Sequence, residues 1–127
     1  MTDIVLSIHP RHVENILSRK KSIEVRKTNI KYIFEGDRIY LYATAPIKKV
    51  VGHCLFWSRW MFTSDCPEWA FEETCLTWEE LKAYIPWPQF GLFIEVRAPT
   101  RYSEPKDLSD FGLARPPQSF CYVKRAE

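Results

Sequence analysis

The chain has 127 residues, 46% of them hydrophobic and 27% charged, and a formal net charge of +2. This composition excludes a disordered chain, because it supplies enough apolar surface for a core, and the length predicts a single domain over residues 1–127. No apolar run approaches the about 20 residues of a membrane-spanning helix and no signal peptide is visible, so we expect a cytoplasmic protein that contacts no membrane.

Short strands and one helix are expected in the first half of the chain. The apolar segment from Ile4 to Ile8 favours a strand, and Pro10 suits the first turn of a helix. Val13 and Ile16 then share one helical face. The other expected strands of this half cover residues 22–26, 38–43 and 48–56.

The second half begins with its least regular segment, residues 57–71, for which the pattern leaves a helix and a covering loop open. Thr77 and Glu80 match the capping box that begins a helix, and Pro86 ends it. The elements expected beyond it are a strand over 90–96, a loop with Pro99 and Pro105, and a strand over 120–123. About six short strands with two or three helices predict an α+β domain whose sheet curls into a small barrel.

The basic segment between residues 19 and 31 is the most informative part of the chain, with six basic residues and one acid, Glu24. In its strand, alternation places Ile23 and Val25 on one face and Glu24 and Arg26 on the other. We expect the charged face to lie on the solvent side of a sheet edge. A cationic cluster of this kind can bind a phosphate, which indicates nucleic-acid or nucleotide chemistry.

Cations and polar groups around this segment are candidate contacts for RNA or a nucleotide. Arg26 can bind a phosphate in a bidentate manner, and Arg11 lies at a helix start, where backbone N–H groups also favour anions. Tyr42 can stack on a base, although core filling explains an aromatic residue better. Gln118 can reach a base edge, although a turn explains it equally well. The candidate contacts are Ser7, Arg11, Arg19, Lys20, Arg26, Lys27, Tyr42 and Gln118.

Metal and cofactor chemistry have no support in the residue spacing. The four cysteines include no C-x-x-C pair, and the three histidines lack the spacing of zinc ligands. No glycine-rich phosphate loop is present either. We therefore expect no metal and no cofactor, while the oligomeric state stays open.

Five motifs resemble those of ASCH domains and occur in the same order. They lie in residues 6–26, 36–43, 49–52, 91–96 and 116–120, so the resemblance extends over nearly the whole chain. It implies a PUA-like fold, in which helices flank a small β-barrel and a basic cleft. It also implies a partner that is RNA or a modified nucleotide.

The resemblance implies three alternatives for function. Some ASCH proteins are amidohydrolases that act on N4-acetylcytidine, others are ribonucleases, and many are RNA-binding or regulatory modules. Lys21 matches the lysine of the amidohydrolases, and Glu80 best matches their glutamate on the later helix. Glu24 stands where they have a threonine, so this chain lacks that hydroxyl.

Lys21, Glu24 and Glu80 are therefore the candidate catalytic residues, each with an alternative. Lys21 is better suited to stabilise an anion than to act as a nucleophile, and otherwise it is a solvated lysine. Glu24 is either a general base or half of a surface ion pair. The capping box alone explains Glu80, although catalysis is compatible with it if the helix start faces the cleft. We expect an RNA- or nucleotide-binding domain that is a metal-independent ribonuclease, an amidohydrolase or a non-catalytic module.

Overall fold

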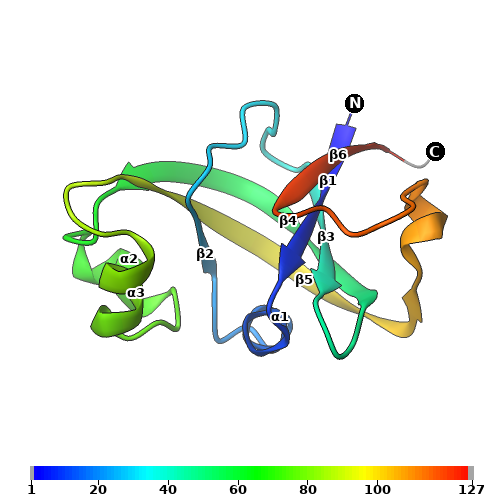
Figure 1. The fold of residues 1–127 in the computed structure, drawn as a ribbon, viewed down its shortest axis with the longest axis horizontal. Helices are drawn as coiled ribbons and strands as arrows, with labels where there is room; N and C mark the ends of the chain where they lie inside the picture. The colour runs from blue at the N-terminus through cyan, green and yellow to red at the C-terminus, as the bar shows by residue number, and fades with distance from the viewer. Residues whose placement is uncertain (1, 126–127) are drawn as a thin grey trace.

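The computed structural model describes residues 2–125 (Figure 1). Its elements are β1 (Thr2–Ile8), α1 (Pro10–Leu17), β2 (Ile23–Arg26), β3 (Arg38–Ala43), β4 (Lys49–Phe62), α2 (Glu68–Glu72), α3 (Trp78–Tyr84), β5 (Gly91–Lys106), the 3₁₀ helix η1 (Leu108–Phe111) and β6 (Phe120–Lys124). Within the described residues no helix is long and apolar enough to cross a membrane.

The strands form one six-stranded mixed sheet in the order β2-β5-β4-β3-β1-β6. Strands β1 and β3 are parallel, whereas the other neighbouring pairs are antiparallel. The expected α+β class is confirmed. The expected closed barrel is not, because strand pairing within residues 2–125 leaves the sheet open between β2 and β6.

Strands β4 and β5 are longer than the sequence predicts. Strand β4 continues through residues 57–62, for which the sequence pattern allowed either a helix or a covering loop. Strand β5 runs through Pro99 and Pro105, where we expected a loop. Strand β2 pairs with β5 only from Leu92 to Glu95, so the second half of β5 has a free edge within the described residues. A proline is tolerated there, because its missing N–H removes no ladder hydrogen bond.

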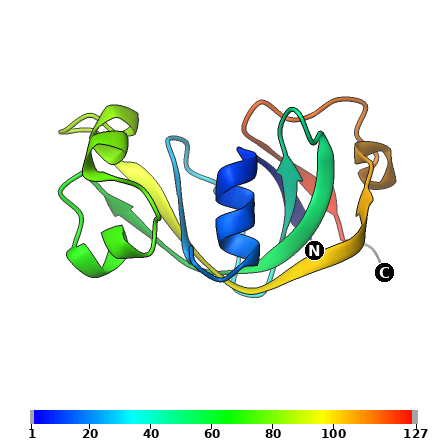
Figure 2. The same ribbon diagram turned by 90° about the horizontal axis from the view of Figure 1, so that it is seen from below.

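Three clusters of buried side chains form the core. The largest packs α1 against the sheet, and Figure 2 shows this helix on the concave side of the long curved strands β4 and β5. A second joins α2 and α3 to one end of the sheet, around Phe93 and Leu81. A third lies on the other face of β1 and β3, around Val5 and Tyr40. Alternation along β1 produces this division, since Ile4 and Leu6 face α1 whereas Val5 faces away from it.

Candidate functional site

A cleft of about 300 Å³ lies between α1, β2 and α3. Ile8, Val25 and Leu76 supply its apolar wall, and Tyr84 closes one side. The polar side chains that line it are those of His9, His12, Lys21, Glu24, Arg26 and Glu80. The cleft thus combines an apolar wall with a concentrated set of ionisable groups.

The charged face of β2 is buried, which corrects the expectation that it lies in solvent. The Lys21 side chain is 1% exposed and that of Glu24 is 7% exposed. Glu24 pairs in register with Ile94, which belongs to the main core cluster, so its face of β2 turns toward α1. Residues Ile23 and Val25 face the α2–α3 cluster instead. Alternation identified the two faces of β2 correctly, but both of them are covered.

Arg26 is held by four hydrogen bonds in the floor of the cleft. Its Nη1 contacts Glu24 Oε2 at 3.2 Å and the Ser7 carbonyl at 3.1 Å, and its Nη2 contacts Ser119 Oγ at 2.8 Å and the Ser119 carbonyl at 3.4 Å. Its buried Nε–H has no partner within residues 2–125. Since a guanidinium carries five N–H donors, four are satisfied by the fold itself.

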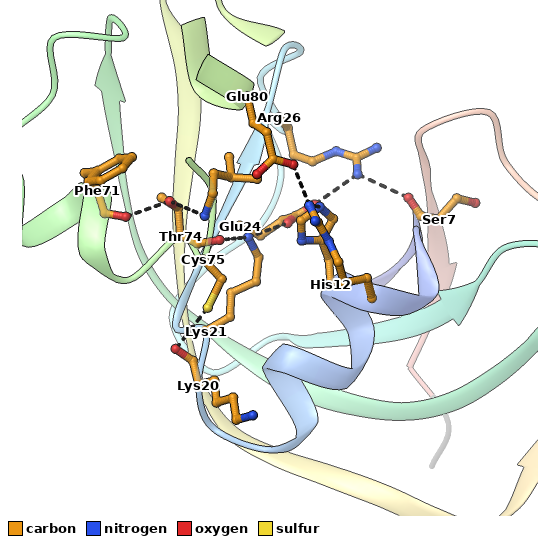
Figure 3. A network of polar contacts seen from close by, with 12 residues as sticks. Ser7, His12, Lys20, Lys21, Glu24, Arg26, Phe71, Thr74, Cys75 and Glu80 are labelled. Carbon is orange, nitrogen blue, oxygen red and sulfur yellow. Dashed lines mark hydrogen bonds and ion pairs between the residues drawn. The ribbon is translucent and has the colours of Figure 1, made fainter. Parts of the chain in front are cut away.

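Lys21 lies on the other side of Glu24, so the carboxylate sits between two cations. The Lys21 ammonium is 3.4 Å from Glu24 Oε1 and also donates to the Thr74 carbonyl, in the turn between α2 and α3. Figure 3 shows these side chains as one connected group with His12 beside them. Because an ammonium has three N–H donors, one of them remains for a ligand in the cleft.

Glu80 lines the cleft and pairs with Arg11, which lies outside the lining. Glu80 completes the capping box with Thr77, as expected, and its Oε2 accepts from Arg11 Nη2 at 2.6 Å. The backbone N–H of Thr77, followed by the Arg11 hydrogen bond, lowers the pKa of Glu80 to about 2. The start of α3 therefore faces the cleft, as its lining by Glu80 shows. The helix cap and the ion pair with Arg11 are together sufficient to explain a glutamate at position 80.

His12 is a site residue that the sequence analysis missed. Burial and the charge of Lys21 lower the pKa of its imidazole, so it is neutral at pH 7. Its Nε2 lies 3.4 Å from Arg11 Nη2, and since arginine can only donate, Nε2 is the acceptor and Nδ1 carries the hydrogen. That buried Nδ1 has no partner within residues 2–125. The only sequence signal was a histidine in the first turns of the helix that follows β1.

The remaining predicted residues lie at different distances from the floor. Ser7 is close to it, although its hydroxyl donates to the Pro117 carbonyl at 2.7 Å. Arg19 and Lys20 are exposed in the turn after α1, and Figure 3 shows Lys20 pointing away from the ion pairs. Lys27 is exposed, with its Nζ 4.9 Å from the centroid of the Tyr84 ring.

Of the eight candidate contacts only Arg26 lines the cleft, so Tyr42 and Gln118, like the other five, lie outside its lining. Tyr42 is 4% exposed and packs in the third core cluster, so its proposed stacking role is wrong, because a base cannot reach its ring. Gln118 is exposed in the loop before β6, next to Ser119. Ser119, which like Gln118 was expected either to reach a base edge or to serve a turn, and Thr74, which no local sequence signal identifies, both bind the residues of the floor.

The charges of the cleft balance. Lys21 and Arg26 line it as cations, and Glu24 and Glu80 line it as anions. Among the described residues, no group of three or more His, Cys, Asp or Glu side chains is arranged to hold a metal ion. The cleft therefore offers directional hydrogen-bond donors rather than a strong positive field.

Comparison with solved structures identifies the fold. An ASCH protein from Zymomonas mobilis superposes with a TM-score of 0.84 at 23% identity, covering 97% of this chain and 88% of that one. The chain has the ASCH-domain fold. Two mutants of the same protein, one Tyr-to-Phe and one Ser-to-Ala, superpose with TM-scores of 0.83 at 22% identity, covering 97% of this chain and 91% and 89% of theirs. No protein-family model and no curated protein sequence matches the chain.

The ASCH-domain fold, which the motif order implied, accounts for the position of the cleft. Helices α1 and α3 lie on either side of β2. Three segments that are distant in sequence therefore meet at the cleft. At 22–23% sequence identity, the similarity shows a shared fold and no more.

Proposed function

We propose that the protein binds a nucleoside unit, free or within RNA, in the cleft between α1, β2 and α3. The observation that carries this proposal is the buried Lys21–Glu24–Arg26 floor of a cleft of about 300 Å³. That volume is at the lower end of the range typical of small-molecule sites, which run from about 300 to 1,000 Å³. A single nucleoside fits such a space, whereas a strand of RNA needs an extended groove.

The balanced charge of the cleft favours an uncharged group such as a base. A phosphate would bring negative charge to a floor where Glu24 already pairs with both cations. The third N–H of Lys21 is instead suited to a carbonyl or ring-nitrogen acceptor on the edge of a base. Exposed Arg19, Lys20 and Lys27 then contact the phosphates of RNA outside the cleft.

Hydrolysis of an acylated base is a second function that one observation favours. Glu24 Oε1 lies 3.4 Å from the Lys21 ammonium, which places an acceptor for a proton beside a cation. In such a reaction Glu24 takes a proton from water, and the resulting hydroxide adds to the acyl carbonyl, whose oxyanion Lys21 stabilises. Collapse of the tetrahedral intermediate breaks the C–N bond, and Glu24 returns the proton to the departing amine. Cleavage of RNA by the same pair would need a phosphate at the floor, which the charge balance disfavours.

The test combines calorimetric binding with turnover. Cytidine and N4-acetylcytidine are titrated into the wild type and into Tyr84→Ala, a change in the wall of the cleft. We expect binding that depends little on salt, because these ligands carry no phosphate, and that weakens in Tyr84→Ala. Absence of nucleoside binding, or equal affinity in the variant, contradicts the proposal.

Turnover is measured separately by incubating the protein, in excess chelator, with total RNA and with N4-acetylcytidine. Deacetylation that is lost in a folded Glu24→Gln variant supports the hydrolase. Binding without product leaves a non-catalytic module, and cleavage of RNA that is lost in the same variant makes the protein a metal-independent ribonuclease.

A further inference from the structure

A second cavity, of about 460 Å³, lies on the opposite face of the sheet from the cleft. Tyr40 lines it and belongs to the third core cluster, whereas Ile8 lines the cleft and belongs to the cluster beneath α1. The cavity is formed where η1 approaches the C-terminal end of β6. Figure 1 shows these two segments on the same side of the molecule, far from α2 and α3.

Cations outnumber the single carboxylate of Asp110 among the described residues that line this cavity. Arg38, Lys106 and Lys124 make no ion pair within residues 2–125. Lys106 has its Nζ 5.0 Å from the centroid of the Tyr102 ring, a contact that leaves its charge unneutralised. The lining of the cavity therefore carries an excess of positive charge, which the lining of the cleft lacks. Asp110, at its edge, accepts from the backbone N–H of Asp107 and so caps η1.

The remaining cation, Arg125, is already paired. Its Nη2 lies 2.7 Å from both Asp3 Oδ1 and Asp37 Oδ1, two buried carboxylates. These contacts fix one wall of the cavity, and because one guanidinium faces two carboxylates they leave one negative charge against the three cations Arg38, Lys106 and Lys124.

Polar aromatic groups form the rest of the lining. His53 Nδ1 lies 2.7 Å from the Tyr102 hydroxyl. Burial raises the pKa of Tyr102 to about 12, and burial with the charges of Arg38 and Lys106 lowers the pKa of His53. Both groups are therefore uncharged at pH 7 and add hydrogen-bonding atoms without changing the charge. Tyr40 packs against Phe111 with ring centroids 4.6 Å apart, and both rings line the cavity.

We propose that this cavity binds a phosphate group, carried either by a free nucleotide or by RNA. A guanidinium binds phosphate oxygens in a bidentate manner, and lysines add point charges around them. Arg38 and Lys124 flank the cavity from β3 and β6, so a phosphate between them neutralises charge that the fold leaves unpaired. This site is distinct from the cleft in position, charge and ligand.

The test is a titration followed by amide NMR of the labelled full chain. The probes are inorganic phosphate, adenosine 5′-monophosphate, adenosine and the dinucleoside monophosphate ApA. We expect phosphate and adenosine 5′-monophosphate to shift the amides of Tyr40, His53 and Tyr102, and adenosine to leave them unchanged. Equal shifts for adenosine and its monophosphate at these residues, or none for any probe, overturn the proposal.

Charge-removing variants localise the binding. Arg38→Gln combined with Lys124→Gln should weaken phosphate affinity at least about tenfold, since each charge-assisted bond is lost at exposed positions that tolerate substitution. Lys31→Gln combined with Lys82→Gln is the matched control and should leave the affinity unchanged. Equal phosphate affinity in the two double variants overturns the proposed phosphate site.

The dinucleoside monophosphate ApA distinguishes a phosphate of the RNA backbone from a free or terminal phosphate. Binding of ApA as tight as that of the monophosphate identifies the RNA backbone, and binding of the monoesters alone identifies a free or terminal phosphate. Nucleoside binding in the cleft shifts Val25 and Tyr84 instead, so each site can fail independently of the other.

Discussion

Arg26 on β2 donates from Nη1 to the backbone carbonyl of Ser7 on β1 at 3.1 Å. These strands are first and fifth in the sheet order and do not pair directly. A single guanidinium therefore connects two strands across the opening of the curved sheet. Its Nη2 also donates hydrogen bonds to Ser119, in the loop before β6. The floor of the cleft is thus also a structural joint, so its residues affect stability and binding together.

Arg26→Ala should lower the free energy of unfolding by about 3–5 kcal/mol, measured by urea denaturation. The change removes one partner of a buried ion pair and leaves the acceptors of Ser7 and Ser119 without a donor. Lys31→Ala is the control, with an expected change within about 0.5 kcal/mol, because Lys31 is exposed. A similar effect of both changes would contradict the structural role of Arg26.

Lys21→Met should destabilise the protein by about 3 kcal/mol, whereas a solvated lysine would cost almost nothing. The methionine keeps the apolar stem but leaves the Thr74 carbonyl without its donor and Glu24 with one cation. In a double-mutant cycle with Glu24→Gln, the two changes should cost less together than the sum of the single changes, by about 1 kcal/mol or more. Additive effects would mean that the two side chains do not interact.

His12 should titrate below the ordinary value of 6.5, which an NMR pH titration of the imidazole measures directly. Because its pKa is lowered in the folded state, the unfolded chain binds the proton more readily, and stability falls as the pH drops below 6.5. At neutral pH the ¹⁵N shifts should identify the Nδ1–H tautomer, since Nε2 faces the Arg11 guanidinium. A midpoint above 6.5, or an Nε2–H tautomer, would contradict this geometry.

The contribution of Glu80 to stability should vanish at low pH. Its pKa is lowered to about 2 from an ordinary value of 4.5, so its stabilisation is complete above pH 4.5 and is lost as the pH falls toward 2. Comparing the Tm of the wild type with that of Glu80→Gln over this range isolates the effect, because glutamine keeps the capping box and loses the charge. Equal Tm values for the two proteins at every pH would attribute the role of Glu80 to the cap alone, and a difference that does not depend on pH would contradict the role of its charge.

Local signals predicted the elements with clear boundaries. Strand β3 was expected over residues 38–43, as observed, and α3 begins at the expected capping box of Thr77 and Glu80. The continuation of β5 through Pro99 and Pro105 was not predictable, because it depends on which part of β5 lies at a free edge.

The site was only partly predictable. Lys21, Glu24 and Arg26 were identified as candidates, and they do lie together in the cleft. Their burial depends on segments distant in sequence, since Thr74 lies 53 residues after Lys21 and Ser119 lies 93 residues after Arg26. Alternation along one strand defines its two faces, but it does not tell whether another part of the chain covers them.

The most direct test of the central claim is a nucleoside titration of the ¹⁵N-labelled protein, with cytidine and N4-acetylcytidine as ligands. If the cleft is a nucleoside site, the amides of Val25, Leu76 and Tyr84 should shift together and saturate, while those of His53 and Lys124 in the second cavity stay in place. If neither nucleoside shifts the amides of the cleft, or if the shifts occur only elsewhere, the buried Lys21–Glu24–Arg26 floor is a structural joint and not a binding site.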